Sequence, residues 1–223
     1  MKNQTILFDI NETVLNLNLL KPKFMAVFND ESTLNLWFSH LLHTSTVCSL
    51  TGNKSAFASL ASDALENIAA RKGVKLSSED RDHILSTFSS LKPHDDIKPS
   101  LAKLRANGYK TIAFSNSSSA LINKQIDNAG LLEDFDQIIS VEETGSFKPD
   151  PKVYQYAAKL LSQPIDSLRL VATHDWDTHG ALSAGMSAAY INRSGTPYHP
   201  QYLKPEIIAN DMNEIVEQII AAK

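Results

Sequence analysis

The stretch Thr5-Ile6-Leu7-Phe8-Asp9 decides the fold of this chain. Its first four residues form a short and mostly apolar run, and a carboxylate follows directly. A continuous apolar run of this length is typical of a strand that is buried on both faces of a parallel sheet. In open α/β sheets the ligand crevice lies outside the carboxyl ends of the strands. Asp9 is therefore a candidate nucleophile as well as a candidate helix-capping residue.

Four further runs of the same kind follow along the chain. They are Thr111–Phe114, Gln137–Ile139, Leu168–Ala172 and Ala188–Ile191. Amphipathic stretches separate them, such as Leu101–Leu104, which Gly108 closes, and Val153–Leu161. Alternating strands and helices predict βαβ units, so we expect an α/β fold with a Rossmann-like parallel sheet. Apolar residues at helical spacing predict a last packing helix over Glu206–Ile220.

The segment from about Leu15 to Leu91 lacks strand-like runs and is predicted to form consecutive helices. A first helix is expected from Ser32 through Leu42, a second from about Asn53 to Arg71, and a third after a capping serine, Ser77. We interpret this segment as a helical domain inserted after the first strand. The predicted division is a core of residues 1–14 and 93–223 and a helical domain of residues 15–92.

The composition is that of an ordinary globular protein, since 43% of the 223 residues are hydrophobic and 21% are charged. The net charge of -4 provides no basic stripe for phosphates, so we expect no nucleic-acid partner. Cys48 is the only cysteine, which excludes an intrachain disulfide. We find no signal peptide or bilayer-length apolar stretch and expect a cytoplasmic protein without membrane contact. Leu41, Leu42 and Val47 are expected to pack either within the helical domain or across a homodimer interface.

Polar clusters stand at the predicted carboxyl ends of four strands. They contain Asp9 and Thr13, then Ser115–Ser118, then Lys148 before two prolines, then His174, Asp175, Asp177 and His179. Each cluster alone has an ordinary structural explanation, such as a helix cap, a βα loop or a solvated lysine. The last cluster holds metal-ligand residue types but no helix-spaced ligand pair of established type. Because the carboxyl ends of parallel strands meet at one edge, we expect the clusters to share one crevice.

In this order the clusters resemble the four motifs of the haloacid dehalogenase superfamily: a strand-terminal Asp, a Ser or Thr, a Lys and an acidic loop. The matching residues are Asp9, Ser115, Lys148 and Asp177, and the resemblance covers essentially the whole chain. Within the superfamily the chain looks most similar to the L-2-haloacid dehalogenases of type II. The details that carry this similarity are Ser115-Asn116, Lys148-Pro149-Asp150 with Val153-Tyr154, Trp176-Asp177 and Ile191-Asn192-Arg193. The resemblance makes the helical insert the family's cap domain.

The resemblance implies a hydrolase that acts on a small halogenated carboxylic acid. Asp9 would attack the carbon that bears the halogen and form an ester, which water then hydrolyses. Lys148 is expected to orient Asp9, Asp177 to position or activate the water, and Tyr154 to support Lys148. Ser115 is expected to bind the substrate carboxylate or hold the nucleophile. The substrate-binding positions that the resemblance implies are Thr13, Asn11, Asn116, Phe38, Tyr154 and His174.

Two positions favour halide displacement over phosphate transfer. The superfamily's phosphatases use a second Asp two positions after the nucleophile, where this chain has Asn11. Their Mg²⁺ motif begins with an acid that is Thr173 here, which weakens a site for a hard cation. We therefore predict no metal and no cofactor. Two alternatives stay open: a Mg²⁺-dependent phosphatase of a small phosphorylated metabolite that would use Asp175 and Asp177 for the metal, and a catalytically inactive binding member.

Other positions depart from the family pattern. The family's cap arginine, which follows a tryptophan and receives the halide, is Phe38 after Trp37 here. The family's glycine before the motif threonine is Glu12, and its usual asparagine in the fourth motif is His174. These differences leave the nucleophile in place and leave the identity of the substrate open.

Overall fold

The computed structural model describes residues 4–222, and within them it contains a six-stranded sheet in the order β3-β2-β1-β4-β5-β6. Every neighbouring pair of strands runs parallel. The strands are β1 (Thr5–Asp9), β2 (Lys110–Ser115), β3 (Gln137–Ser140), β4 (Leu168–Ala172), β5 (Ser187–Ile191) and β6 (Ile207–Ala209). The predicted α/β class and parallel sheet are confirmed.

The end of the chain differs from the prediction, because a strand precedes the last helix. Ile207–Ala209 pairs with β5 as the edge strand β6, and the helix α9 spans only Met212–Ala221. Burial along β6 alternates, since Ile207 and Ala209 face the core and Ile208 is exposed. The N-cap Asp211 then accepts the backbone N–H of Glu214 and starts α9. The single helix predicted over Glu206–Ile220 was wrong because three alternating residues also fit a helical spacing.

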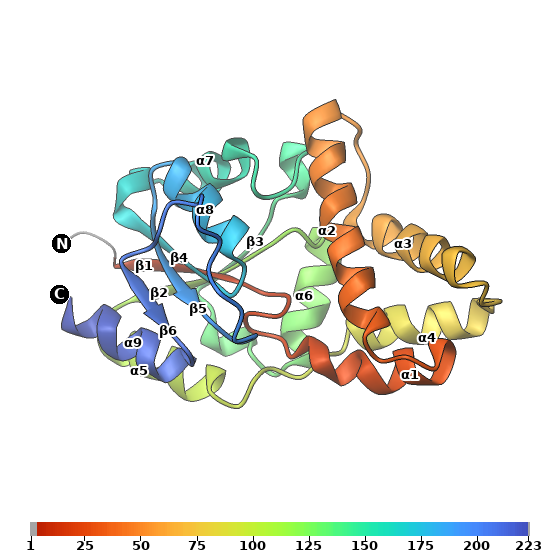
Figure 1. Cartoon of the computed structure of the whole chain (residues 1–223). Helices are drawn as coiled ribbons and strands as arrows, with labels where there is room; N and C mark the ends of the chain where they lie inside the picture. Colours follow the sequence, from red (N-terminus) through yellow and green to blue (C-terminus); the bar gives the residue numbers. More distant parts are fainter. Residues whose placement is uncertain (1–3, 223) are drawn as a thin grey trace.

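Helices cover both faces of the sheet (Figure 1). α5 (Ile97–Ala106) and α9 lie against one face, and α7 (Pro151–Leu160) and α8 (Asp175–Ser183) lie against the other. α6 (Ser119–Asn128) packs against β3. Short 3₁₀ turns are η1 (Leu17–Leu20), η2 (Leu132–Asp134), η3 (Glu142–Thr144) and η4 (Ile165–Ser167).

Four helices form a separate group beyond the carboxyl ends of the strands (Figure 1). They are α1 (Lys21–Phe28), α2 (Thr33–Thr51), α3 (Phe57–Lys72) and α4 (Ser78–Phe88). The second predicted helix starts at Phe57 rather than near Asn53, because α2 continues to Thr51 and Gly52 ends it in the left-handed region (φ 71°). Ser77 caps α4 as predicted by accepting the backbone N–H of Asp80. Helix α1 was not predicted.

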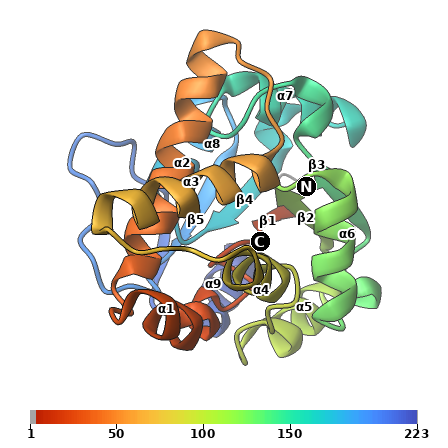
Figure 2. The same ribbon diagram turned by 90° about the vertical axis from the view of Figure 1, so that its right-hand side faces the viewer.

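The chain crosses between the sheet and these helices at two segments that lie side by side. Leu15 and Pro93 form an antiparallel bridge, the backbone N–H of Asn16 donates to the Lys92 carbonyl (2.9 Å), and that of His94 donates to the Val14 carbonyl (2.9 Å). The predicted boundaries, 14/15 and 92/93, fall at this bridge. We propose that it separates a core domain from a cap domain, and Figure 2 shows the helices from the cap side.

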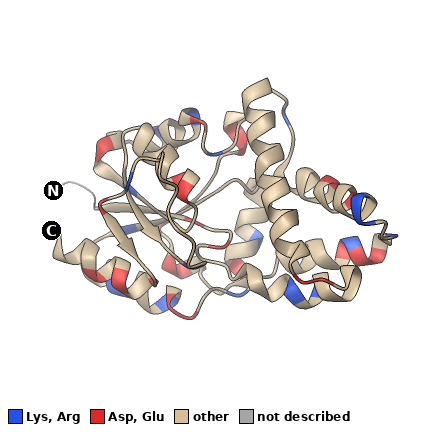
Figure 3. Cartoon of the chain, in the orientation of Figure 1, with Lys and Arg blue, Asp and Glu red and all other residues tan. Residues whose placement is uncertain are grey.

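Charges of both signs are interspersed along the helices, as Figure 3 shows for one view. Some form exposed pairs, such as Lys72 with Asp30 (2.9 Å) and Arg81 with Glu66 (3.1 Å), which contribute little to stability. Over residues 4–222, none of the helices has the length and apolar character that a membrane span requires.

Candidate active site

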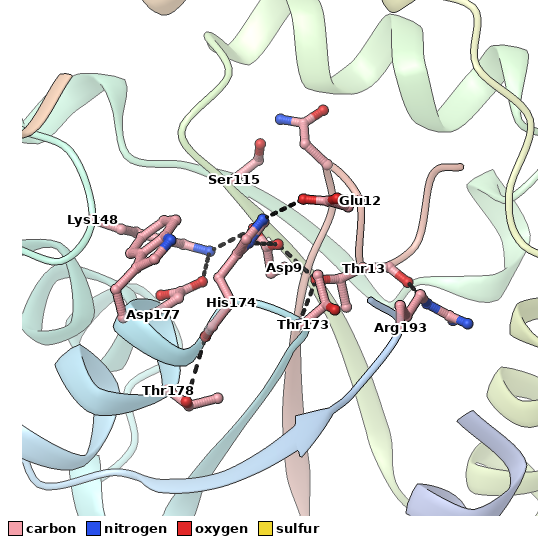
Figure 4. A network of polar contacts seen from close by, with 12 residues as sticks. Asp9, Glu12, Thr13, Ser115, Lys148, Thr173, His174, Asp177, Thr178 and Arg193 are labelled. Atoms are coloured by element: carbon pink, nitrogen blue, oxygen red, sulfur yellow. Dashed lines mark hydrogen bonds and ion pairs between the residues drawn. The ribbon is translucent and has the colours of Figure 1, made fainter. Parts of the chain in front are cut away.

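Asp9 ends β1 and is almost fully buried, with 6% of its surface exposed. Thr13 Oγ1 donates a hydrogen bond to Asp9 Oδ2 (2.7 Å), and Lys148 Nζ donates one to Oδ1 (3.1 Å; Figure 4). Burial by itself would raise the pKa of the Asp9 carboxyl. The charge of Lys148 and the hydrogen bonds from His174 and Thr13 outweigh burial and hold this pKa well below its usual value. Asp9 is therefore ionised at neutral pH, as a carboxylate nucleophile must be.

Lys148 lies just before α7 and is buried, with 1% of its surface exposed. Its ammonium group donates to Asp9 Oδ1, to the Phe114 carbonyl (3.0 Å) and to Asp177 Oδ2 (2.9 Å). Burial alone would lower the pKa of Lys148, but the charges of Asp177 and Asp9 raise it above its usual value. Its backbone N–H donates to Asn116 Oδ1 (2.9 Å), which fixes the loop that carries the lysine. Lys148 is thus a permanent cation between two carboxylates.

Asp177 lies in the first turn of α8 and has no exposed surface. Its Oδ2 accepts from Lys148, and its Oδ1 accepts the hydroxyl of Tyr154 (2.6 Å). Burial raises the pKa of Asp177; Lys148 opposes this shift and Asp9 adds to it. Tyr154 was predicted to support Lys148, but its hydroxyl bonds Asp177 instead, so it reaches the lysine only through that carboxylate. This geometry suits holding Lys148 in place and leaves neither Asp177 oxygen open to water.

Glu12 and His174 form a second charged pair beside Asp9 (Figure 4). His174 Nδ1 lies 3.2 Å from Asp9 Oδ2, and its Nε2 lies 2.8 Å from Glu12 Oε2. Burial by itself would lower the pKa of His174, but its hydrogen bonds to Asp9 and Glu12 raise it to about 10. His174 is therefore an imidazolium between two carboxylates in the free protein. Both residues were identified from the sequence as departures from the family pattern, but their pairing was not predicted. An acidic and a basic residue departing together was the one sign of this pairing in the sequence.

The remaining predicted polar residues surround Asp9 but bond protein atoms. Ser115 is fully buried, and its Oγ accepts the backbone N–H of Ser117 (3.1 Å). Asn11 donates to Ser117 Oγ (3.3 Å) and accepts from Gln125 Nε2 (3.0 Å). The Asn116 side-chain oxygen is taken by Lys148, as described above. These bonds hold the loops around Asp9, and the predicted substrate-side roles of the three residues stay predictions.

A cavity of about 370 Å³ adjoins the Glu12–His174 pair. Phe38, Trp176 and Arg193 also line it. The ring of Phe38 lies 5.8 Å from that of His174, centroid to centroid, and Trp176 stacks on His174 at 5.0 Å. Phe38 and His174, two predicted substrate-side residues, thus meet at the wall of a space large enough for a small acid. Arg193 is engaged elsewhere, because its guanidinium binds Asp96 (2.9 and 3.1 Å) and the Thr13 carbonyl.

The residues present do not fit a Mg²⁺ site. Lys148 binds one oxygen each of Asp9 and Asp177. The second oxygen of Asp9 binds Thr13 and His174, and the second oxygen of Asp177 binds Tyr154. Asp175, the other acid of the phosphatase alternative, accepts the backbone N–H groups of Trp176 (2.8 Å) and His199 (3.2 Å). Across the described part of the chain no three His, Cys, Asp or Glu side chains are grouped to hold a metal. The ligand set therefore argues against the phosphatase alternative.

Comparison with known proteins agrees with this geometry. A family model for haloacid dehalogenase-like hydrolases matches residues 4–168. An (S)-2-haloacid dehalogenase of Pseudomonas fluorescens is 28% identical over 223 residues, which cover 99% of this chain and 98% of that protein. The L-2-haloacid dehalogenase of Xanthobacter autotrophicus has the same fold, with a TM-score of 0.90 at 21% identity over 97% of this chain and 98% of its own. The family predicted from the four motifs is confirmed: the chain belongs to the haloacid dehalogenase-like hydrolases.

Proposed function

We propose that the protein is a metal-independent 2-haloacid dehalogenase that works through an ester on Asp9. The observation that carries this proposal is the position of Lys148, whose ammonium binds Asp9 Oδ1 at 3.1 Å and Asp177 Oδ2 at 2.9 Å. A buried lysine there orients and charge-balances a carboxylate nucleophile without a metal ion. The similarity to (S)-2-haloacid dehalogenases over 99% of the chain supports the same reaction.

Halide displacement needs few groups from the protein. An oxygen of Asp9 forms a bond to the carbon that bears the halogen, and the carbon–halogen bond breaks with its electron pair on the halide. Halide leaves without a proton, so no general acid is required at the position of Asn11. Water then hydrolyses the ester at the carboxyl carbon of Asp9, which releases a hydroxy acid and restores the carboxylate. Phe38, at the position of the family's cap arginine, contributes an apolar wall beside His174.

The test is to measure halide and phosphate release side by side, with and without EDTA. The substrates are chloro-, bromo- and fluoroacetate, both enantiomers of 2-chloropropionate, and a panel of small phosphate esters. We expect halide release that EDTA does not change. The Asp9→Asn variant should lose at least about a thousandfold in rate, since it removes the nucleophile itself.

Mg²⁺-dependent phosphate release without halide release would overturn the proposal and restore the phosphatase alternative. Release of neither product, together with tight binding of a small acid, would identify an inactive binding member. An ester trapped on Asp9 and located by mass spectrometry would exclude the alternative of an inactive binding protein. Cytoplasmic location, homodimer formation and the absence of a nucleic-acid partner stay predictions.

A further inference from the structure

The Glu12–His174 pair occupies the side of Asp9 that adjoins the cavity. His174 Nδ1 faces Asp9 Oδ2 at 3.2 Å, and Glu12 Oε2 binds the opposite ring nitrogen at 2.8 Å. The His174 side chain is 11% exposed and that of Glu12 is 37% exposed, and both line the cavity. A carboxylate on one ring nitrogen leaves the other nitrogen directed at the reacting group, as in catalytic triads.

The backbone at Glu12 gives a second, independent sign that its carboxylate has a use. Glu12 has a φ of 70°, in the left-handed region where residues other than glycine are uncommon. Its carbonyl oxygen is bonded by His94 Nε2 (3.1 Å), which helps to hold this conformation. Strained residues of this kind collect at functional sites, where the rest of the structure enforces them. A glycine would fit this turn without strain, so the backbone conformation does not explain the carboxylate at this position.

Asp177 is poorly placed to take a proton from water. Lys148 and Tyr154 hold its two oxygens at 2.9 and 2.6 Å, and the side chain has no exposed surface. Activation of water by Asp177 would require it to give up one of these buried partners. His174 has the opposite character, because it touches the nucleophile and lines the cavity through which water would enter.

We propose that His174 is the general base that activates water for hydrolysis of the Asp9 ester, and that Glu12 is its positioning residue. This inference rests on the dehalogenase function proposed above. In the free enzyme both ring nitrogens bind carboxylates, and these contacts raise the pKa of His174 to about 10. Esterification removes the negative charge of Asp9, so His174 loses one of its two anionic partners and releases its Nδ1 proton to solvent. Glu12 remains on Nε2 and keeps the ring in place.

The hydrolytic step then balances. Water beside Nδ1 gives a proton to His174 while its oxygen bonds the Asp9 carboxyl carbon. With the alkyl group on Oδ2, the oxygen that His174 faces, the resulting oxyanion is Oδ1, which lies next to Lys148. Collapse breaks the bond between that carbon and the alkyl oxygen. The departing alkoxide takes the remaining acid proton of Asp9 and leaves as the hydroxy acid. Asp9 is again a carboxylate, His174 is again protonated, and one proton has been released for each halide.

Rapid-quench single turnovers separate the two half-reactions. Wild type, His174→Gln and Glu12→Gln are mixed with a haloacid, beginning with (S)-2-chloropropionate, and halide, ester on Asp9 and hydroxy acid are followed in time. Since His174 also contacts the nucleophile, we expect halide release to slow in both variants, but by much less than ester hydrolysis. Ester hydrolysis should slow about a hundredfold in His174→Gln, as for loss of a general base, and about tenfold in Glu12→Gln. The ester should then accumulate on Asp9.

His83→Gln is the matched control, because His83 is an exposed histidine on α4 outside the site. It should leave both steps unchanged. Wild-type ester hydrolysis in His174→Gln would overturn the inference and leave the dehalogenase proposal standing, as would equal slowing of halide release and ester hydrolysis. If His174→Gln does not fold, Glu12→Gln decides by the same two rates. Absence of halide release by the wild type would overturn both proposals together.

Discussion

At the scale of single residues, the site depends on compensation of buried charge. An ammonium group without partners in a protein interior is strongly destabilised. Lys148 is stable there because two carboxylates and the Phe114 carbonyl accept hydrogen bonds from its ammonium group. The ammonium also lies 4.4 Å from the centre of the Phe114 ring. Asp177 in turn needs Tyr154 for its second oxygen. Each buried charged group is stable only while its hydrogen-bond partners are in place. A single substitution should therefore lower the stability of the protein by more than the loss of one hydrogen bond would.

Tyr154→Phe tests this dependence with little change of shape. The variant leaves Asp177 Oδ1 without its hydroxyl partner in a fully buried place, so the free energy of unfolding should fall by about 1–3 kcal/mol. Urea denaturation measures the change. Tyr156→Phe is the control, because Tyr156 is a half-buried tyrosine of the same helix. Equal stability changes in the two variants would show that the Tyr154 hydroxyl has no special part in the network.

At the scale of secondary-structure elements, the close approach of α7 and α8 positions Asp177 beside Tyr154. Gly180 lies within α8, where glycine is less favourable than alanine by about 1 kcal/mol. A Cβ atom at Gly180 would lie 2.5 Å from the Tyr154 hydroxyl oxygen and 2.7 Å from Pro149 Cβ. Only glycine therefore lets α8 pack this closely on the start of α7 and bring Asp177 to Tyr154.

Gly180→Ala should destabilise the protein despite the better helix propensity of alanine. Displacement of Tyr154 and Pro149 is expected to lower the free energy of unfolding by about 1–3 kcal/mol, as is usual for overpacking. It should also slow halide release, because a shift of Asp177 would displace Lys148, which is hydrogen-bonded to it. Ser183→Ala, an exposed change in the same helix, should be neutral or stabilising. A Gly180→Ala protein as stable as Ser183→Ala would show that the helices can separate without cost.

At the scale of the whole molecule, one ion pair connects segments from across the core. Arg193 follows β5 and binds Asp96 at the start of α5 with both terminal nitrogens, and its Nε donates to the Thr13 carbonyl (3.0 Å). Asp96 also accepts the backbone N–H of Met212 at the start of α9 (2.8 Å). Burial raises the pKa of Asp96, but the hydrogen bonds from Arg193 and Met212 outweigh it and lower the pKa.

This pair predicts a pH dependence of stability. A lowered pKa in the folded state means that Asp96 stabilises the fold fully above its unfolded pKa of about 3.9 and loses this effect as pH falls further. Asp96→Asn should therefore lower the free energy of unfolding by about 1.5–3 kcal/mol at pH 7, the range for hydrogen bonds to charged groups. The difference from wild type should shrink towards pH 3 in urea denaturation. Asp95→Asn, an exposed neighbour, should show no such difference; a constant gap for Asp96→Asn would contradict the argument.

The sequence by itself determined the sheet and the edge at which its polar residues gather. Five apolar runs with polar residues at their ends are sufficient, because parallel strands bring those ends together wherever the helices pack. The family followed from the order of Asp9, Ser115, Lys148 and Asp177, and the fold and family predictions were confirmed. The edge strand β6 was missed because three residues do not distinguish a period of two from a helical one.

Tertiary structure alone decided which charged groups meet. Glu12 and His174 are 162 positions apart and touch only because β4 lies beside β1 in the sheet. The partner of Tyr154 depended in the same way on how closely α7 and α8 pack. Local sequence sets the backbone conformation of a segment, but contacts between side chains of different segments depend on distances that the packing of the whole chain sets. The role proposed for Asp9 was therefore readable from its motif, whereas its direct contact with His174 was not.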